Sequence, residues 1–494
     1  MANSENLLDI ELIKKKAISG VVTFTLRTFF IQAFTFFATF ILTILLDPSI
    51  FGVFFVVSAI LNLFVYFSDI GLAAALIQKK EEPKRQDLTT TFTIQQIIVF
   101  TLVVVGLIFS GSIARFYNLD TQGTFLLRIL IFSLILSSLK TIPSIILERK
   151  LAFTRLVIPQ VAENIIFYSI AIILAYLGYG LASFSWAVLA RGLAGLAIIY
   201  FLSPWRPGFS FNFKSAKNLI NFGVPFQLNS ILALIKDDLL TVFLGKILTF
   251  NQIGYVGWAQ KFGFVPLRFF MDNVIKVTFP AYSRLQENRK ELAKVIEKSL
   301  FFVAYLVYPS VLGILAIAPK IVEIIPKYGK WEPAIPLLYF FGINAIFAAV
   351  NTTLTNTLFA LGKPKIVLNL MVIWTVLIWV LTFILVKIYG FVGVGVASAI
   401  VAASTSVTIY FVKKEIPVSI GRNIFMPLFI SIIMFFTVRA ILNVLPLNIF
   451  GLIFAIVIGV IVYFSMSLGF MGKNLTDQIK IIFTVLVSKD KTSQ

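Results

Sequence analysis

The sequence predicts an all-α integral membrane protein of about fourteen transmembrane helices: two six-helix lobes related by a pseudo-twofold axis along the membrane normal, plus a C-terminal helix pair. Three observations support this class. Of 494 residues, 59% are hydrophobic and only 13% are charged, whereas about a quarter are charged in soluble domains. The apolar residues form blocks of roughly 20, the length that crosses a hydrocarbon core about 30 Å thick. The chain also repeats itself at an offset of roughly 200 residues.

The expected helices are the apolar blocks, which are separated by short breaks that carry turn residues. The blocks cover 17–46, 50–77, 89–113, 124–147, 156–178, 181–203, 217–245, 252–281, 296–318, 333–361, 365–388, 391–412, 424–445 and 448–470. Asp47-Pro48 and Gly362 are examples of the turn chemistry between them. The tail after the last block, 473–488, has Lys among Ile and Val and predicts an interfacial helix.

The distribution of basic residues predicts the orientation. Most Lys and Arg residues outside the blocks fall in alternate connecting segments together with both termini. Because cytoplasmic segments of membrane proteins collect Lys and Arg, both termini are expected in the cytoplasm, at the cell (inner or plasma) membrane. The segment 319–332, with three Lys on the outer side, is an exception. The first sixteen residues show no cleavable signal peptide and predict a short amphipathic segment.

The internal repeat predicts the domain organisation. Residues 178–201 resemble residues 389–411, and Gly52 has a counterpart in Gly254. A repeat unit of six helices is even, so the two copies share one orientation. The expected parts are an N-terminal segment 1–16, an N-lobe 17–203, a cytoplasmic linker 204–218, a C-lobe 219–412, two further helices within 413–470 and an amphipathic cytoplasmic tail 471–494.

Composition excludes several kinds of site. The chain has no Cys and no His, which excludes disulfides, thiol nucleophiles, Cys/His zinc sites and histidine proton relays. The net charge of +20 is attributed to cytoplasmic loops rather than to nucleic-acid binding. No metal or cofactor is expected. Coupling to Na⁺ or H⁺ stays open, and it would need carboxylates, amides, hydroxyls or backbone carbonyls.

Several stretches, taken together in order and spacing, resemble the Wzx-type oligosaccharide-lipid flippases and polysaccharide exporters of the MOP exporter superfamily. They are DIGLAAALIQ at 69–78, KDDLL at 236–240, FLG at 243–245, IGY at 253–255, FPAYSRLQ at 279–286 and GKWEPA at 329–334. The likeness covers the first twelve helices, with the colanic-acid and teichuronic-acid exporters most similar. It implies a V-shaped pair of lobes that opens alternately to each side and passes a polyprenyl-diphosphate-linked oligosaccharide. The resemblance also implies that the protein is a monomer. It could work alone or in a complex with a polysaccharide polymerase and a chain-length regulator.

Ionisable residues within the spans are the candidate site residues, because a charge at mid-bilayer costs about 2.5–3.5 kcal/mol and usually faces a cavity or a partner. Arg27 lies ~16 Å into the first helix and Asp69 ~14 Å from the inner end of the second, at 1.5 Å per residue. If helices 7 and 8 are antiparallel neighbours, Lys236 and Lys261 share one depth. Arg268, Asp272 and Lys276 follow at four-residue intervals, which aligns them on one face of helix 8.

Two interpretations of these charges stay open. Arg27, Lys236, Lys261, Arg268 and Lys276 would form a basic cavity that holds a diphosphate, and Asn351 and Asn356 would contact sugar hydroxyls. Alternatively, the basic residues pair with Asp69, Asp237, Asp238 and Asp272 and join helices. Glu163 and Arg191 would pair within the first lobe, and Lys276 could simply reach toward the inner surface.

Ion coupling has its own candidates. Asp237 and Asp238 point about 100° apart on a helix, so one could face a cation site completed by oxygens of Asn369, Ser404 and Thr405. Asp69 is a further candidate carboxylate. Carboxylates with neutral oxygens suit a hard cation. A salt bridge from Asp237 or Asp238 to Lys236 or Lys261 is the alternative.

Four functions compete on the sequence. The first is a flippase for a lipid-linked oligosaccharide. The second is a cation-coupled drug exporter of the same fold, which a basic cavity disfavours because it would repel cationic substrates. The third is a membrane polysaccharide polymerase or glycosyltransferase, for which the largest outer loop, 319–332, is short. The fourth is a scaffold, which would need no charges inside the spans.

Overall fold

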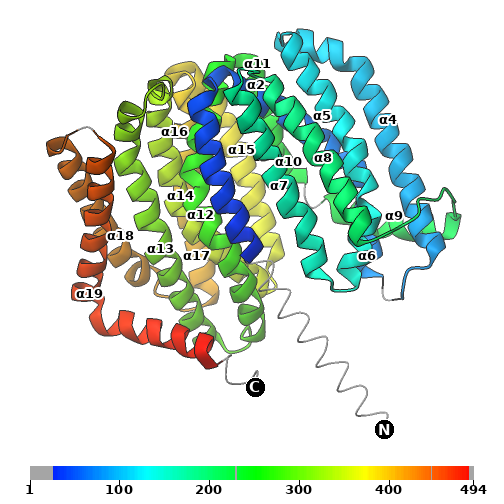
Figure 1. Cartoon of the computed structure of the whole chain (residues 1–494). Helices are drawn as coiled ribbons and strands as arrows, with labels where there is room; N and C mark the ends of the chain where they lie inside the picture. The colour runs from blue at the N-terminus through cyan, green and yellow to red at the C-terminus, as the bar shows by residue number, and fades with distance from the viewer. Residues whose placement is uncertain (1–25, 80, 229–230, 447, 489–494) are drawn as a thin grey trace. The chain divides into compact units, whose positions relative to one another are not determined.

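The computed structural model of the chain describes residues 26–79, 81–228, 231–446 and 448–488, and the regular elements in these ranges are helices (Figure 1). Twelve helices of this part of the chain are long and apolar enough to cross a membrane. The predicted class, an all-α multi-pass membrane protein, is therefore confirmed. The N-terminal segment 1–16 lies outside the described residues, and the lobe boundaries stay predictions.

The chain packs as two compact units. Unit 1 is Met1–Trp258 with Met371–Phe383, and unit 2 is Ala259–Leu370 with Ile384–Gln494. Unit 1 contains the helix Leu26–Leu45, α2 (Pro48–Asp69), α3 (Leu72–Gln78), α4 (Arg85–Tyr117), α5 (Thr121–Leu139), α6 (Thr141–Arg149), α7 (Phe153–Tyr176), α8 (Ala182–Leu202), α9 (Phe213–Leu228), α10 (Ile231–Leu234), the π-helix η1 (Ile235–Leu239) and α11 (Leu240–Ile247).

Unit 2 contains α13 (Arg289–Ile324), the 3₁₀ helix η2 (Gly329–Ala334), α14 (Ile335–Ala360), α16 (Val392–Ala403), α17 (Thr405–Glu415), α18 (Ile420–Val444) and α19 (Ile449–Ser488). Two helices contribute residues to both units: α12 (Phe250–Arg284) and α15 (Pro364–Tyr389).

In unit 1, close helix packing depends on small residues and on stacked aromatic rings. Helices α7 and α8 pack along each other, and α5 contacts both α4 and α8. Phe54 stacks on Phe184 with 4.3 Å between ring centroids. Gly192 lies against Leu136 and Gly195 lies directly against Glu163, so neither position has room for a side chain. This agrees with the packing role that small residues have in membrane helices.

In unit 2, α13 packs along α18, and α14 packs between α13 and α16. The Tyr463 hydroxyl of α19 donates to the Tyr305 carbonyl of α13 at 2.8 Å, and this bond ties the last helix pair to the rest of the unit. Trp331 and Tyr328 are buried and anchor the segment around η2. That segment overlaps 319–332, the stretch whose three Lys were the exception in the predicted orientation; its first part, to Ile324, belongs to α13.

Several predicted spans are interrupted, which corrects the continuous blocks. The block 50–77 breaks at Ile70 and Gly71, which have φ angles of 48° and 73°. The block 217–245 was expected as one helix, but it consists of α9, α10, η1 and α11. The block 391–412 divides at Ser404. Hydrophobicity did not reveal these breaks because the apolar pattern continues through them.

The C-terminal tail turns sharply after the last span. Gly472, with φ 11° and ψ −92°, separates the first part of α19 from the helix that follows it to Ser488. Figure 1 shows this last segment, in red, running nearly perpendicular to the part before it. The helix predicted over 473–488 is present, and its place at the membrane surface stays a prediction.

The segment predicted as the linker, 204–218, is hydrogen-bonded to α4. Asp87, at the start of α4, accepts hydrogen bonds from Lys79 Nζ at 2.6 Å and from Ser215 Oγ at 2.7 Å. Thr93 Oγ1 donates to the Ser210 carbonyl at 3.1 Å. The segment is therefore held to the first half of the chain by polar contacts with α4.

Candidate functional site

The predicted site residues of unit 1 make local contacts. The Arg27 guanidinium donates to Gln160 Oε1 of α7 at 2.7 Å. Both carboxylate oxygens of Asp69 lie 3.3 Å from the Ala73 amide, where they accept its hydrogen bond at the start of α3. Asp69 thus stabilises the helix that restarts after the break at Ile70 and Gly71.

The π-helix η1 carries the three charged residues of the KDD motif. Lys236 Nζ lies 3.3 Å from Asp237 Oδ1, so these neighbours form an ion pair. Asp238 Oδ1 accepts from Asn62 Nδ2 of α2 at 2.7 Å. This places the two carboxylates in different environments, as their predicted angular separation required. The pair with Lys236 corresponds to the salt-bridge alternative for Asp237.

A tryptophan of another helix donates a hydrogen bond to this π-helix. Trp379 Nε1 of α15 donates to the Ile235 carbonyl at 3.1 Å. A π-helix shifts the backbone hydrogen-bond register, and such turns often occur at functional sites. The side chain of Trp379 therefore stabilises the irregular backbone at the KDD motif, a role that its own sequence position did not reveal.

A buried ion pair in unit 1 was only half predicted. Glu163 Oε1 of α7 accepts from Lys140 Nζ at 2.6 Å, and each side chain is about one-fifth exposed. Arg191 lies over the Phe167 ring at 5.2 Å from its centroid, and its charge interacts electrostatically with Glu163. Arg191 was predicted as the partner of Glu163, whereas Lys140, inside the block 124–147, was not.

In unit 2, the basic residues of α12 are accessible. The helix continues unbroken from Phe250 to Arg284, so the four-residue spacing from Arg268 to Lys276 does align them on one face. Lys261 is half-buried, whereas Arg268 and Lys276 are exposed. Among the described residues, Arg268 has no hydrogen bond or ion pair with another side chain.

The structure brings Lys276 together with Asn356, two residues that the sequence proposed separately. Both line an open cavity of about 470 Å³ between α12 and α14. Its lining is Ile275, Lys276, Phe279, Pro280, Asn356 and Phe359; we refer to it as the polar pocket. It offers an ammonium group, an amide and two aromatic rings.

Asn356 is positioned for this role by its own helix. Its Nδ2 donates to the Thr352 carbonyl at 2.8 Å, which holds the side chain in place. Asn351 lies on the same helix, and its buried Oδ1 has no hydrogen-bond partner among the described residues. The amides of α14 therefore keep acceptor capacity for hydroxyl groups.

Two further ion-coupling candidates, Asn369 and Thr405, lie in unit 2. Asn369, on α15, is exposed. Thr405, at the start of α17, is buried and its hydroxyl donates to the Ala402 carbonyl at 2.7 Å. In the described part of the chain, no group of three acidic residues is placed to hold a metal ion.

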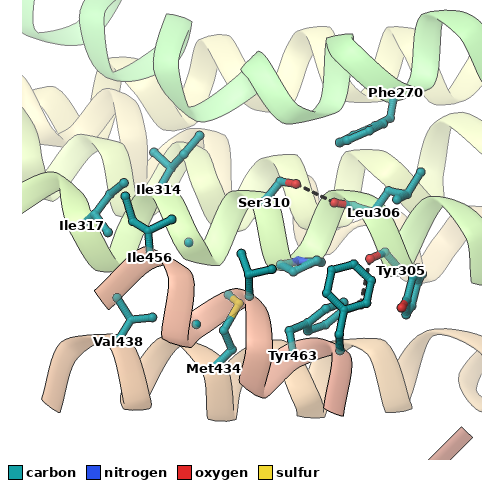
Figure 2. Close-up of a pocket in the computed structure, with 15 residues that line it drawn as sticks. Phe270, Tyr305, Leu306, Ser310, Ile314, Ile317, Met434, Val438, Ile456 and Tyr463 are labelled. Atoms are coloured by element: carbon teal, nitrogen blue, oxygen red, sulfur yellow. Dashed lines mark hydrogen bonds between the residues drawn. The ribbon is translucent and has the colours of Figure 1, made fainter. Parts of the chain in front are cut away.

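Unit 2 also contains a second cavity, of about 300 Å³, that the sequence analysis did not predict (Figure 2). Its lining is almost wholly apolar: Phe270, Tyr305, Leu306, Pro309, Ser310, Gly313, Ile314, Ile317, Met434, Val438, Ile456, Gly459, Val460, Tyr463 and Phe464. We refer to it as the apolar pocket. The Ser310 hydroxyl donates to the Leu306 carbonyl at 2.7 Å, whereas the Tyr305 hydroxyl has no hydrogen-bond partner among the described residues. Figure 2 shows Met434, Ile456 and Tyr463 pointing toward the α13 side chains.

Comparison with known proteins gives related sequences and a shared fold. The family model described as "Polysaccharide biosynthesis protein" matches residues 41–336. The chain is 22% identical over 410 residues to the lipopolysaccharide biosynthesis protein WzxC of Escherichia coli (strain K12), covering 81% of each. It is 23% identical over 369 residues to the "Probable low-salt glycan biosynthesis flippase Agl15" of Haloferax volcanii, covering 73% of this chain and 76% of that one.

Among solved structures, the lipid II flippase MurJ in an inward closed conformation superposes with a TM-score of 0.74. The superposition covers 91% of this chain and 98% of that chain at 18% sequence identity. At this identity the likeness establishes the fold alone, and the chain has the fold of that protein.

Proposed function

Because the chain belongs to the polysaccharide biosynthesis protein family of the MOP exporter superfamily, a family of transporters rather than enzymes, we propose that it is a flippase for a polyprenyl-diphosphate-linked oligosaccharide. It moves the lipid from the cytoplasmic to the outer leaflet by alternating access. The relatives whose names mention lipopolysaccharide and glycan biosynthesis support this substrate class.

The observation that carries the proposal is the presence of two pockets in unit 2, one with Lys276 and Asn356 among apolar residues and one with an almost wholly apolar lining. A lipid-linked oligosaccharide has an anionic, hydroxyl-rich head and a hydrocarbon chain. In the polar pocket, Lys276 matches the diphosphate by charge, and Asn356 matches sugar hydroxyls. The apolar pocket offers van der Waals contact to the hydrocarbon chain.

Further basic residues extend the head-group site. Lys261 and Arg268 lie on α12 in unit 2 with the polar pocket, and Asn351 adds an amide near Asn356. Arg27 and Lys236 belong to unit 1, and their contribution stays a prediction. Arg268 supports this assignment most directly, because it is exposed without a partner among the described side chains. Lys236 contributes less, since Asp237 already neutralises part of its charge.

In this proposal the protein has fourteen transmembrane helices. The twelve candidate spans are joined by two further spans, the interrupted segment α9–α11 and the helix α12. Helices 1–6 and 7–12 form two lobes around a pseudo-twofold axis. Both termini lie in the cytoplasm and the protein resides in the cell membrane. It works as a monomer, in contact with the polymerase and chain-length regulator of a polysaccharide biosynthesis complex, and it binds no nucleic acid.

Transport is coupled to Na⁺ or H⁺ through the carboxylates of the broken helices. Asp238 is the strongest candidate, because a neutral amide, Asn62, rather than a cation faces it at 2.7 Å. Asp237 is neutralised by Lys236 and Asp69 is committed to the Ala73 amide. Asn369 and Thr405, in unit 2, stay predictions as further oxygen donors.

Cation-coupled drug export is the alternative function on this fold. Drug exporters of this kind mostly carry cationic substrates, and a pocket with Lys276 would repel them. The exposed Arg268 on the same helix face adds to this repulsion. Substrate charge therefore separates the two functions.

Ligand-induced stabilisation of the purified protein tests this proposal. We expect a long-chain polyprenyl diphosphate to raise the unfolding temperature in detergent by several degrees, since a ligand at 100 times its Kd stabilises by about 2.7 kcal/mol. A cationic dye at the same concentration should leave it unchanged.

The variant Gly313→Leu is the test of the apolar pocket. Gly313 lines that pocket, and a Cβ atom there would meet only the Met434 methyl group at 3.9 Å, so a larger side chain enters the pocket without overlap at its first atom. We expect it to remove most of the stabilisation by the long-chain lipid. Gly469→Leu on α19, where no atom lies within 4 Å, is the control. Stabilisation by the dye but not by the diphosphate would favour drug export.

A further inference from the structure

One seam in unit 1 joins α2 to the segment that follows the linker. Helix α2 contacts α11, η1 and the start of α12, and the residues just beyond its end contact α9. In order along α2, the paired positions are Gly52 with Phe250, Val56 with Gly245, Asn62 with Asp238, Tyr66 with Gln227, and Gly71 with Gly223. The residue numbers rise along α2 and fall along the opposing segment, so the two segments run antiparallel. We refer to these contacts as the α2 seam.

The outer end of the α2 seam is closed by a reciprocal glycine contact. A Cβ atom on Gly52 would overlap the carbonyl of Phe250, the first residue of α12. A Cβ atom on Gly254 would overlap the carbonyl of Pro48, the first residue of α2. Each glycine lies four residues into its own helix and contacts the first residue of the other. The two helix starts can approach this closely only because both glycines lack a side chain.

The inner end of the α2 seam repeats the arrangement. A Cβ atom on Gly71 would overlap the Gly223 carbonyl, and one on Gly223 would lie 2.5 Å from the Ile70 carbonyl oxygen. Both contacts are again backbone to backbone. Because the obstructing atoms belong to the main chain, they cannot rotate away as the end of a flexible side chain would.

The middle of the α2 seam is held by side-chain hydrogen bonds rather than by close backbone contacts. Tyr66 and Gln227 exchange two hydrogen bonds, from the Tyr66 hydroxyl to the Gln227 carbonyl at 2.6 Å and from Gln227 Nε2 to the Tyr66 carbonyl at 2.8 Å. Asn62 bonds Asp238 nearby. Long polar side chains keep contact over a range of helix separations, whereas the glycine contacts exist only at full closure.

We propose that the two reciprocal glycine contacts are the closing surfaces of two gates. Gly52 and Gly254 seal the outer gate, and Gly71 and Gly223 seal the inner gate. Both sides of the seam pack within unit 1. The inference rests on the proposed function, because α2 belongs to the predicted N-lobe and most of the opposing residues to the predicted C-lobe, and alternating access would open this seam at one end at a time. A methyl group at either contact blocks closure of that gate only and shifts the population toward the opposite state.

Accessibility of a single thiol tests the gates, since the chain has no Cys of its own. The reporter is Asn62→Cys, at the exposed middle of the α2 seam. Each glycine variant is made on this background: Gly254→Ala for the outer gate and Gly223→Ala for the inner gate. Gly71 is avoided because its φ of 73° would strain any side chain. Gly111→Ala, on α4 with no atom within 4 Å, is the matched control.

A membrane-impermeant maleimide is added to right-side-out or to inside-out vesicles. We expect Gly254→Ala to raise the labelling rate from the outside about tenfold and Gly223→Ala to raise it from the cytoplasmic side by a similar factor. Gly111→Ala should match the reporter alone. Equal increases from both sides would indicate misfolding, and unchanged labelling would show that closure does not need these glycines; either result overturns the proposal.

The test is independent of the substrate. Labelling needs no lipid-linked oligosaccharide, so a protein that moves no such lipid can still show opposite, sided responses in the two variants. Conversely, if the protein moves the lipid but both variants are labelled equally from the two sides, the flippase function stands and the assignment of the gates is wrong.

Discussion

Lys276→Ala should lower the initial rate of oligosaccharide-lipid translocation about tenfold or more. Lys276 supplies the positive charge of the polar pocket, and hydrogen bonds to charged groups contribute about 1.5–3 kcal/mol. Every 1.4 kcal/mol corresponds to a factor of ten. The rate is measured in proteoliposomes with a fluorescent polyprenyl-diphosphate oligosaccharide.

Companion variants separate charge from geometry. Lys276→Arg keeps the charge and should retain a substantial part of the rate, whereas Asn356→Leu should lose less than Lys276→Ala because it removes a neutral group. Lys294→Ala is the control, since that ammonium is exposed and paired with Glu291 at 2.8 Å. A normal rate for Lys276→Ala in protein that folds as wild type would mean that the diphosphate is held elsewhere.

Glu163→Gln should cause the largest loss of stability, about 2–4 kcal/mol, because breaking a buried ion pair leaves an uncompensated charge. The change deprives Lys140 of its partner at 2.6 Å and removes the carboxylate that faces Arg191. Two cations then remain in a region that is about four-fifths shielded from solvent at the ion pair. Unfolding temperature in detergent is the measurement.

The control compares the loss of stability when each partner of the ion pair is replaced. Lys140→Met should be less destabilising than Glu163→Gln, since Arg191 still balances the carboxylate. The double variant should unfold at a higher temperature than Glu163→Gln alone, because one of the two unbalanced cations is gone. Equal losses for all three would show that the pair contributes through packing rather than through charge.

The membrane class and most helices follow from hydrophobicity, but the interruptions do not. The long apolar runs of α4 and α13 were recognisable because nothing else needs so many consecutive apolar residues. The π-helix η1 was not, because its residues continue an ordinary helical pattern. Its register shift is stabilised by Trp379, which lies far away in sequence. Ile70 likewise adopts a left-handed conformation that a β-branched residue rarely takes.

The candidate site was predicted one residue at a time. A charge inside an apolar span identified Lys276, and an amide identified Asn356, but only the packing of α12 against α14 makes them one pocket. Lys140 was passed over because it lies inside an apolar block. The apolar pocket had no signal at all, since residues such as Ile456 and Val460 look the same whether they face lipid or a cavity.

Translocation by the wild-type protein tests the central claim most directly. Proteoliposomes are loaded with a labelled polyprenyl-diphosphate oligosaccharide in both leaflets, and a glycosidase added outside cleaves the outer pool. We predict that the protected pool then becomes cleavable much faster than in protein-free vesicles, and that Lys276→Ala slows this phase. If the protected pool persists as in protein-free vesicles while the same proteoliposomes transport a cationic dye, the flippase assignment is contradicted.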